Sequence, residues 1–562
     1  MRASLKFGLA AGVLVLGYGC AGITPGEKTP ATPPLATGAP QEFRVMLAPG
    51  NDPKSGRLIV VAAPVAAVRV SAALPRPPVL TTVPGSFIAA QETPFVAPAQ
   101  PVRFDADMLA YPRPLSRIEP GEYWVQVRLD TNRNAAYRLT DAENDFTSVP
   151  VKMTLPSAQP INITLAPERD VVKAGSPPAP AGSPAPGAAA DVEADAHIKQ
   201  VDFLSPMLTE FWGKPTRVRG IILLPPDYDS NRDTYPTVYR TEGFGGSLAG
   251  LSASARRHYA MMKSGDTPPM VRVFLDHSSP WGTHEFADSV NTGPWGTALT
   301  EELIPWLEGR YRMDKEASGR FTTGHSSGGW FAIWQQVRYP NVYGGTWARS
   351  PDPVDFRSFT GINIYNKDAN AYTRPDGTPQ YLVRDASGKE VTSFKDYAQE
   401  ENVLGDYGGQ IDSFDWVFSP RGQDGRPQPL FDRVTGKVDP EVARYWRDNF
   451  DIGHIVRRDW GSLKSVLDGK IHLIMGTMDT FHLDEAAKIL DLEMQVLGAD
   501  ADFYWMEGRT HGNIDRIGDD PNGLEKKIAW EMYAVARPTS KLKPKEFVAP
   551  AAPAAAPATA GQ

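Results

Sequence analysis

Residues 322–332 read TTGHSSGGWFA and set two serines among three glycines, between a strand-like and a helix-like stretch. The central five letters, GHSSG, fit the pattern G-x-S-x-G, in which a serine stands on a sharp turn from a strand into a helix. Glycine on either side allows a tight turn and close packing of the two elements. We therefore predict that Ser326 is a nucleophile and that Ser327 offers its backbone N–H to an oxyanion. A purely structural turn is the alternative.

A serine hydroxyl becomes a useful nucleophile only when a base takes its proton, and the base needs an acid to orient it. Asp479 follows the strand-like stretch KIHLIMG, and His511 follows the strand-like stretch DFYWMEG, 511 − 479 = 32 residues later. That separation suits one loop, one helix and one strand, so both side chains are expected at the same sheet edge as Ser326. Asp484 and Asp502 are rival acids, but the first is interpreted as a helix N-cap and the second as the start of a strand.

The remaining requirement is a second N–H donor for the oxyanion, from a loop after an early strand. The strand-like stretch YPTVYRT is followed by residues 242–247, EGFGGS, and the backbone N–H of Phe244 is the predicted donor. A simple glycine-rich turn explains this segment equally well. His472 lies inside a strand-like stretch and His482 lies near Asp479, so both are interpreted as packing or loop residues.

These residues need a scaffold, and residues 197–540 supply a regular alternation of strand-like and helix-like stretches. Strands are expected in RVRGIILLP, PTVYRT, MVRVFLD, GRFTTG, KIHLIMG and DFYWMEG, and helices in GTALTEELIPWLEGRY and DEAAKILDLEMQVLG. Strands followed by helices in this rhythm indicate an α/β domain with a mostly parallel sheet, covered by helices on both faces. In such sheets reactive groups gather at the carboxyl ends of the strands.

The stretches YPTVYRTEGFGGS, TALTEELIPWLEGRYR, GHSSGGW, GTMDTF and EGRTHG together resemble the esterase D-type branch of the α/β-hydrolase superfamily. The resemblance covers most of residues 200–535 and implies a triad of Ser326, Asp479 and His511. Members usually carry His-Gly where this chain has Glu-Gly at 242–243. That departure sets a carboxylate near the predicted pocket and disfavours a strongly anionic substrate.

The chain between Ser326 and Asp479 is longer than the fold requires, at 479 − 326 = 153 residues. The excess falls in residues 351–456, which are rich in glycine, aspartate and aromatic residues. Long insertions in compact domains are more often functional than idle. We predict that this insertion forms a cap over the pocket, with a surface or dimerisation element as the alternative.

The N-terminus, residues 1–20, has the arrangement of an export signal. MRASLK supplies two positive charges, and the apolar run that follows is shorter than the roughly 20 residues that span a bilayer. Cys20, the only cysteine, resembles the lipidated cysteine of bacterial lipoproteins, with ordinary signal cleavage nearby as the alternative. The mature protein is therefore expected in the bacterial cell envelope, periplasmic or anchored to the outer membrane. One thiol allows no intramolecular disulfide.

Composition divides the rest of the chain. Residues 21–40 form a Pro/Thr/Ala linker, and residues 41–170 carry short alternating runs typical of a small β-sandwich. Residues 171–196 are rich in proline, alanine and glycine and are expected to be an extended, semi-rigid linker. Residues 541–562 are expected to be a disordered tail.

The formal charge of −8 (58 basic minus 66 acidic residues) and the absence of a long basic run argue against a nucleic-acid partner. A membrane partner is expected only through the lipid anchor. No His, Asp or Glu cluster has ligand spacing, so neither a metal nor an organic cofactor is predicted. The favoured function is a serine esterase acting on a small-molecule or carbohydrate-linked ester. An acyltransferase and a non-catalytic binding protein on the same scaffold are the alternatives, and the oligomeric state stays open.

Overall fold

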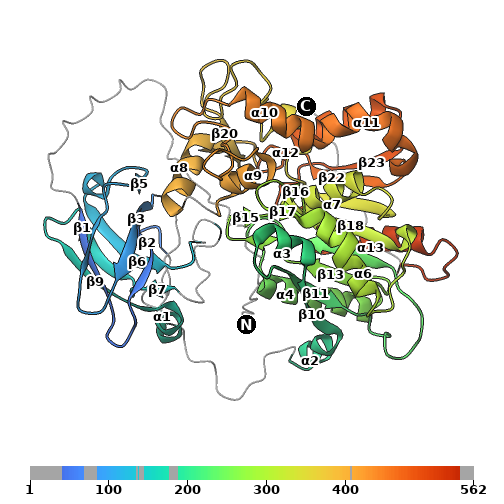
Figure 1. The fold of residues 1–562 in the computed structure, drawn as a ribbon, viewed down its shortest axis with the longest axis horizontal. Coiled ribbons are helices and arrows are strands. Elements are labelled where there is room, and N and C mark those ends of the chain that lie inside the picture. The colour runs from blue at the N-terminus through green and yellow to red at the C-terminus, as the bar shows by residue number, and fades with distance from the viewer. Residues whose placement is uncertain are drawn as a thin grey trace, which may run out of the picture.

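The computed structural model describes residues 41–68, 85–133, 137, 145–175, 188–405 and 408–544. An all-β part at the N-terminal side and a larger α/β part together make up the described chain (Figure 1). The predicted signal peptide, with Cys20, and the linker that follows it lie outside the described residues. Among those that are described, no helix is both long and apolar enough to cross a membrane.

The all-β part is a nine-stranded sheet folded over one apolar core. The strands run in the order β4-β1-β9-β7-β6-β2-β3-β5, and β8 pairs with β6. Phe43 and Val45 from β1 share the core with Leu58 and Val60 from β2 and with Val127 from β6. The strands are β1 (Glu42–Leu47), β2 (Lys54–Pro64), β3 (Phe87–Val96), β4 (Val102–Asp105), β5 (Ala110–Tyr111), β6 (Gly121–Asp130), β7 (Phe146–Thr147), β8 (Val151–Leu155) and β9 (Ile161–Pro167).

The predicted linker at 171–196 differs from expectation at both ends. Helix α1 (Glu168–Gly175) follows β9 directly, and helix α2 (Ala188–His197) leads into the α/β part. Helix α2 begins in an alanine-rich run, AAADVEADAH, and alanine is the strongest helix former. The composition that suggested an extended linker therefore also contains a good helix.

The α/β part contains the expected sheet. Its eight strands run in the order β10-β11-β13-β12-β18-β19-β22-β23, and all are parallel from β13 onward. All six strands expected from the sequence are present, and β10 and β19 are additional. The strands are β10 (Ile198–Leu204), β11 (Arg217–Leu223), β12 (Thr237–Thr241), β13 (Val271–Leu275), β18 (Arg320–His325), β19 (Gly345–Arg349), β22 (Ile471–Gly476) and β23 (Ala501–Met506).

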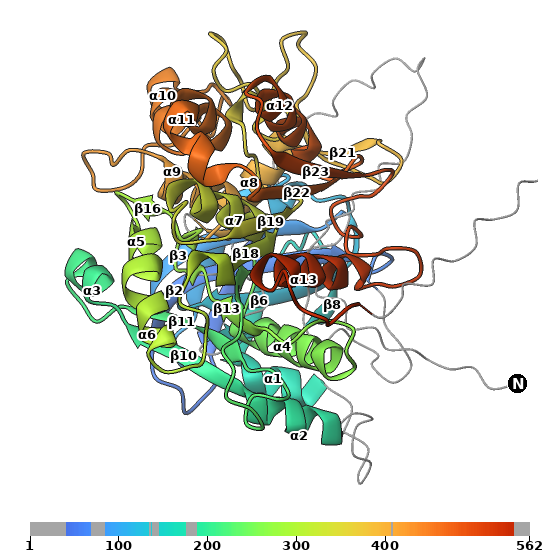
Figure 2. The ribbon, with the colours of Figure 1, turned by 90° about the vertical axis from the view of Figure 1, so that its right-hand side faces the viewer.

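Helices cover both faces of this sheet, as expected (Figure 2). On one face α7, α11 and α12 pack into the largest core, and on the other α4 and α13 pack into two smaller ones. This arrangement and strand order confirm the predicted α/β-hydrolase fold class. The helices around the sheet include α4 (Leu248–Lys263), α6 (Ile304–Glu308) after a π-helical turn (Ala298–Leu303), α7 (Ser327–Arg338), α11 (Ile452–Leu467), α12 (Leu483–Val496) and α13 (Gly523–Ala536).

The insertion between β19 and α11 is built into the largest core and does not simply lie over it. It contains the hairpin β20 (Tyr381–Arg384) and β21 (Glu390–Ser393) and helices α8 (Phe394–Leu404), α9 (Gln410–Phe418) and α10 (Pro440–Asn449). Phe418 of α9 contacts Trp330 of α7, with ring centroids 5.0 Å apart, and Trp446 of α10 at 5.2 Å. Its aromatic content thus has a packing role.

Helix α8 connects the insertion to the all-β part, beside which it lies in Figure 1. Strand β2 is buried on both faces because alternate residues, such as Ile59 and Val61, point away from the core of the all-β part and pack with Val403 of α8. The guanidinium of Arg57 donates to the carbonyl oxygens of Val403 (2.9 Å) and Asn402 (3.1 Å). A cation at the carboxyl end of a helix is favourable, because the helix dipole is negative there.

Candidate active site

Ser326 stands between β18 and α7 in a backbone conformation that few residues other than glycine adopt, with φ 60° and ψ −125°. Such strained residues cluster at functional sites. The flanking glycines are required by close approach. A Cβ on Gly324 would lie 2.1 Å from the carbonyl oxygen of Gly328, and one on Gly328 would lie 2.4 Å from that of Thr241. The G-x-S-x-G spacing therefore has a steric origin in this chain.

His511 and Asp479 meet at the same sheet edge. Nδ1 of His511 and Oδ2 of Asp479 are 2.8 Å apart, and both side chains are almost fully buried. This contact leaves Nε2 of His511 as the nitrogen available to a reacting group. The predicted pairing of acid and base is thus the pairing that the structure shows.

The pKa of His511 reflects two opposing effects. Burial alone lowers it, but the carboxylate of Asp479 outweighs burial and raises the pKa above the usual histidine value, with a smaller contribution from Asp352. The ring of Phe481 packs edge-on against His511, with centroids 5.0 Å apart. His511 is therefore held in place by apolar packing and by the carboxylates beside it.

His325, the residue before Ser326, makes contacts that the sequence did not predict. Its Nε2 lies 2.9 Å from the backbone carbonyl oxygen of His511, and the two rings are 4.4 Å apart. Burial lowers the pKa of His325 well below its usual range, so the ring is neutral and donates Nε2–H to that carbonyl. The histidine loop is thereby tied to the turn that carries Ser326.

The acid loop is held from two sides. The carboxylate of Asp479 accepts a hydrogen bond from the backbone N–H of Phe481 at 2.9 Å, and its backbone carbonyl accepts one from Nε of Arg384 at 2.8 Å. Arg384 comes from the hairpin of the insertion and also binds Asp484 at 2.5 Å. The expectation that Asp484 is a helix N-cap is wrong, because α12 has His482 at its N-cap and Asp484 inside its first turn. Asp484 is instead a buried partner of Arg384.

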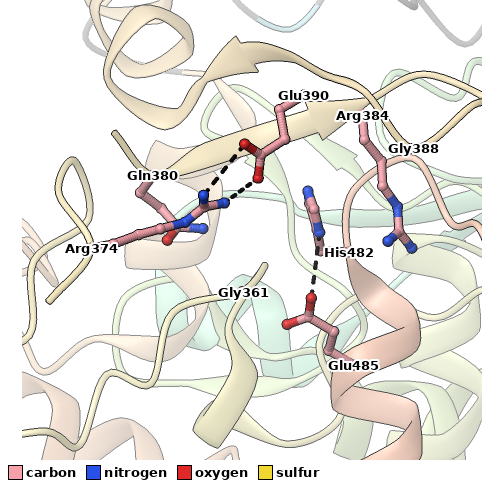
Figure 3. A pocket seen from close by; sticks show the side chains of 8 residues that line it. All are labelled: Gly361, Arg374, Gln380, Arg384, Gly388, Glu390, His482 and Glu485. Carbon is pink, nitrogen blue, oxygen red and sulfur yellow. Dashed lines mark hydrogen bonds and ion pairs between the residues drawn. The ribbon is translucent and has the colours of Figure 1, made fainter. Parts of the chain in front are cut away.

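A polar cavity of about 440 Å³ lies between this hairpin and the start of α12. Figure 3 shows Arg374 paired with Glu390 on one wall and His482 paired with Glu485 in the centre. Arg384 lies on the opposite wall (Figure 3). The cavity and the acid loop therefore share a wall. Its lining residues are Gly361, Arg374, Gln380, Arg384, Gly388, Glu390, His482 and Glu485.

The predicted oxyanion loop lies against the nucleophile. A Cβ on Gly243 would be only 3.1 Å from Cβ of Ser326. The backbone of this loop therefore passes so close to Ser326 that it leaves little room for a side chain at position 243. Tyr137 of the all-β part stacks edge-on against Phe244, with centroids 4.9 Å apart, and donates its hydroxyl to the carbonyl of Gly246 at 3.1 Å. Two parts of the chain thus shape this loop.

The unusual Glu242 of this loop is paired. Its carboxylate lies 3.3 Å from the guanidinium of Arg240, which also contacts Glu525 at 3.2 Å. The side chain of Glu242 is 29% exposed. Glu242 thus stands next to Gly243, which lies against Ser326, and its carboxylate is paired with Arg240.

Asp352, just beyond the end of β19, lies next to both serines of the turn, and the sequence did not predict it. Its Oδ1 accepts the hydroxyl of Ser326 at 3.3 Å, and its Oδ2 accepts that of Ser327 at 2.7 Å. Within the described chain, the Ser326 hydroxyl has this hydrogen bond and none to His511. The signal that could have located Asp352 is the strand GTWAR at 345–349, because a residue after a parallel strand next to the nucleophile strand reaches the same edge.

Comparisons with known proteins identify relatives among esterases. Residues 214–424 match the family described as Putative esterase. Esterase MT1326 and Esterase Rv1288 of Mycobacterium tuberculosis (strains CDC 1551 / Oshkosh and ATCC 25618 / H37Rv) are each 26% identical to this chain over 145 residues. The aligned segment is 26% of this chain and spans 31% of each relative.

Solved structures give weaker similarities. A ferulic acid esterase has a TM-score of 0.37 at 13% identity, covering 60% of this chain and 97% of that protein. An S-formylglutathione hydrolase from Agrobacterium tumefaciens has a TM-score of 0.33 at 13% identity, covering 60% and 94%. Residues 214–424 thus match the family described as Putative esterase, and the strand order of the sheet that they help to form is that of the α/β-hydrolase fold.

Proposed function

We propose that this protein is an exported serine esterase that hydrolyses a carboxylic ester through Ser326, His511 and Asp479. One observation carries the proposal. The buried 2.8 Å contact between His511 and Asp479 lies at the sheet edge where Ser326 stands on its strained turn. A base oriented by a carboxylate, at the same edge as a serine, is the arrangement that activates a hydroxyl for acyl transfer.

The acylation step follows from these atoms. The hydroxyl of Ser326 turns from Asp352 toward Nε2 of His511, which takes its proton as Oγ forms a bond to the ester carbonyl carbon. The carbonyl oxygen becomes an oxyanion, which the backbone N–H groups of Phe244 and Ser327 stabilise. When the oxyanion collapses, the bond to the alcohol oxygen breaks, and the imidazolium of His511 gives its proton to that leaving oxygen.

Deacylation repeats these steps with water. His511 takes a proton from water as its oxygen attacks the acyl-enzyme, and the imidazolium returns the proton to Oγ of Ser326 when the carboxylic acid leaves. Asp479 stays ionised throughout, fixes the tautomer of His511 and stabilises the imidazolium. An alcohol in place of water would make the same step an acyl transfer.

The location of the protein is part of the proposal. The charged start, apolar run and Cys20 of residues 1–20 support export and attachment of a lipid at Cys20. The spacer at 21–40, rich in proline and threonine, would hold the folded part away from the membrane surface.

The proposal is tested with p-nitrophenyl acetate and a fluorophosphonate probe. Ser326→Ala is expected to abolish both hydrolysis and labelling, because the nucleophile is gone. Ser462→Ala, which changes an exposed serine on α11, is the matched control and should behave as the parent protein. Hydrolysis by Ser326→Ala at the parent rate would exclude this serine as the nucleophile.

A further inference from the structure

Two buried acids beside the nucleophile have no part in the triad. Asp352 is 3% exposed and Glu285 is fully buried, and both lie close to the start of α7. Glu285 also has a left-handed backbone, with φ 54°, which is uncommon for a residue with a side chain. Burying acids without a cation is costly, so their presence at this point needs a reason.

Only one of these acids has both of its carboxyl oxygens in hydrogen bonds. Asp352 accepts from both serine hydroxyls through its two oxygens. Glu285 accepts at Oε1 from the hydroxyl of Thr283 at 3.1 Å, while its Oε2 has no hydrogen-bond partner among the described residues. Glu285 lies close to Ser327 as well, but the single proton of that hydroxyl goes to Asp352. A proton on Oε2 removes the negative charge from an oxygen that has no partner, and a neutral carboxyl is less costly to bury than a carboxylate.

The electrostatics agree with this assignment. Burial first, and the charge of Asp352 second, raise the pKa of Glu285 well above its usual range. Burial raises the pKa of Asp352 to about 6, while the hydrogen bond from Ser327 and the nearby His511 oppose that rise. These shifts and the unpartnered Oε2 of Glu285 both favour a proton on Glu285 and a negative charge on Asp352.

The groups around Asp352 define what that charge does. The triad loops supply His511 and Asp479, and α8 of the insertion supplies Tyr397, which lies within electrostatic reach. His511 is the group near Asp352 that gains a positive charge during turnover, and the carboxylate favours that charge.

We propose that Asp352 and Glu285, which lie on either side of the Ser327 hydroxyl, form a second carboxyl pair of the active site with the proton on Glu285 and the negative charge on Asp352. In this pair Asp352 is a positioning residue that holds the hydroxyls of Ser326 and Ser327 and adds a negative charge next to His511. The proposal rests on the proposed esterase function for its kinetic consequence, but not for the protonation of the pair. The two acids have different roles in this proposal. Asp352 carries the negative charge, and Glu285 holds the proton, so that the charge stays on Asp352.

The kinetic test compares Asp352→Asn with Glu285→Gln across pH, following kcat/KM for p-nitrophenyl acetate. Asp352→Asn removes the negative charge beside His511, which lowers the pKa of His511. The acid limb of the pH profile of kcat/KM should therefore move to lower pH by about half a unit or more. Glu285→Gln replaces a neutral group and removes no charge. The acid limb of its pH profile should therefore have the same midpoint as that of the parent protein, even if kcat/KM itself changes. Glu301→Gln, which alters an exposed acid, is the matched control, and both its kcat/KM and the midpoint of its acid limb should equal those of the parent protein.

A second measurement does not need turnover. At pH 7, subtracting the infrared spectrum of Glu285→Gln from that of the intact parent protein should leave the carbonyl stretch of one protonated buried carboxyl. Glu401, whose pKa burial raises to about 8, contributes its band to both proteins, and that band cancels. An unchanged midpoint of the acid limb in Asp352→Asn, or a parent-minus-variant spectrum for Glu285→Gln that lacks this band, would overturn the carboxyl pair. If the parent protein hydrolyses no ester, the proposed function is wrong. The infrared comparison still shows in that case whether Glu285 is protonated. If Asp352→Asn does not fold, the infrared comparison and the limb of Glu285→Gln carry the test.

Discussion

Nε of Arg384, in the inserted hairpin, donates a hydrogen bond to the backbone carbonyl of Asp479, with the two atoms 2.8 Å apart. The backbone N–H of Arg384 donates to the carbonyl of Thr480 at 2.9 Å, so side chain and main chain hold the same loop. The insertion therefore contacts the loop of Asp479, the proposed acid of the triad, directly.

The first prediction concerns this clamp. Arg384→Ala frees the acid loop, and kcat should fall on the order of 10²-fold with a smaller change in KM, because a small misplacement of a catalytic group is costly. Arg374→Ala is the matched control, since Arg374 lines the same cavity but pairs with Glu390 instead of the acid loop. Steady-state kinetics on p-nitrophenyl acetate distinguish them, and equal losses in the two variants would show that the cavity as a whole is responsible.

The second prediction separates Asp479 from its neighbour Asp484. Asp479→Asn should cost on the order of 10⁴ in turnover, because the amide no longer fixes the histidine tautomer. Asp484→Asn should act mainly on stability, because it weakens a buried pair with Arg384 and Lys488. Turnover and denaturant unfolding are measured on both variants. If Asp484→Asn is the more damaging change for turnover and leaves stability intact, the acid has been assigned wrongly.

The third prediction is the pH dependence of kcat/KM. His511 must be neutral to accept the proton of Ser326, so activity falls as the pH drops below the pKa of His511. Asp479 raises that pKa above the usual value, so the midpoint should lie above roughly 6.5. In Asp479→Asn the charge is lost, burial dominates and the midpoint should fall below the parent value. A parent midpoint well under 6 would contradict the described electrostatics.

The sequence was sufficient for the residues whose chemistry depends on strand order. Asp479 and His511 each follow an apolar strand, and parallel strands bring their carboxyl ends to one edge, so the pairing could be predicted. Ser326 could be predicted because its turn requires glycines at fixed positions.

Residues without a fixed pattern could not be found in this way. Asp352 follows a five-residue strand with no motif, and Glu285 comes close to Ser327 although the two segments lie far apart in the chain. The role of Arg384 depends on how the insertion folds back onto the acid loop. Such contacts are set by tertiary packing, which local propensity and hydrophobic periodicity do not report.

The fourth prediction concerns the N-terminus. Cys20→Ser should release the protein from the membrane pellet into the soluble envelope fraction, because no thiol remains for lipid attachment. Detergent partition of the parent protein and of the variant is compared, with the rest of the signal and the spacer at 21–40 left unchanged so that only the thiol differs. Equal membrane partition of the two proteins would exclude lipidation at Cys20.

The fifth prediction tests whether the insertion is a detachable cap or part of the fold. Phe418 of α9 packs against Trp330 of the nucleophile helix at 5.0 Å and against Phe356 at 5.7 Å, and it is 1% exposed. Phe418→Ala should therefore lower the free energy of unfolding by about 3–5 kcal/mol, the range for deleting a buried aromatic ring. Val434→Ala, at an exposed site in the same insertion, is the control and should change stability by less than about 0.5 kcal/mol. Denaturant unfolding measures both. A loss below about 1 kcal/mol for Phe418→Ala would mean that the insertion folds separately from α7, and residues 360–450 could then be replaced by a short linker without unfolding the domain.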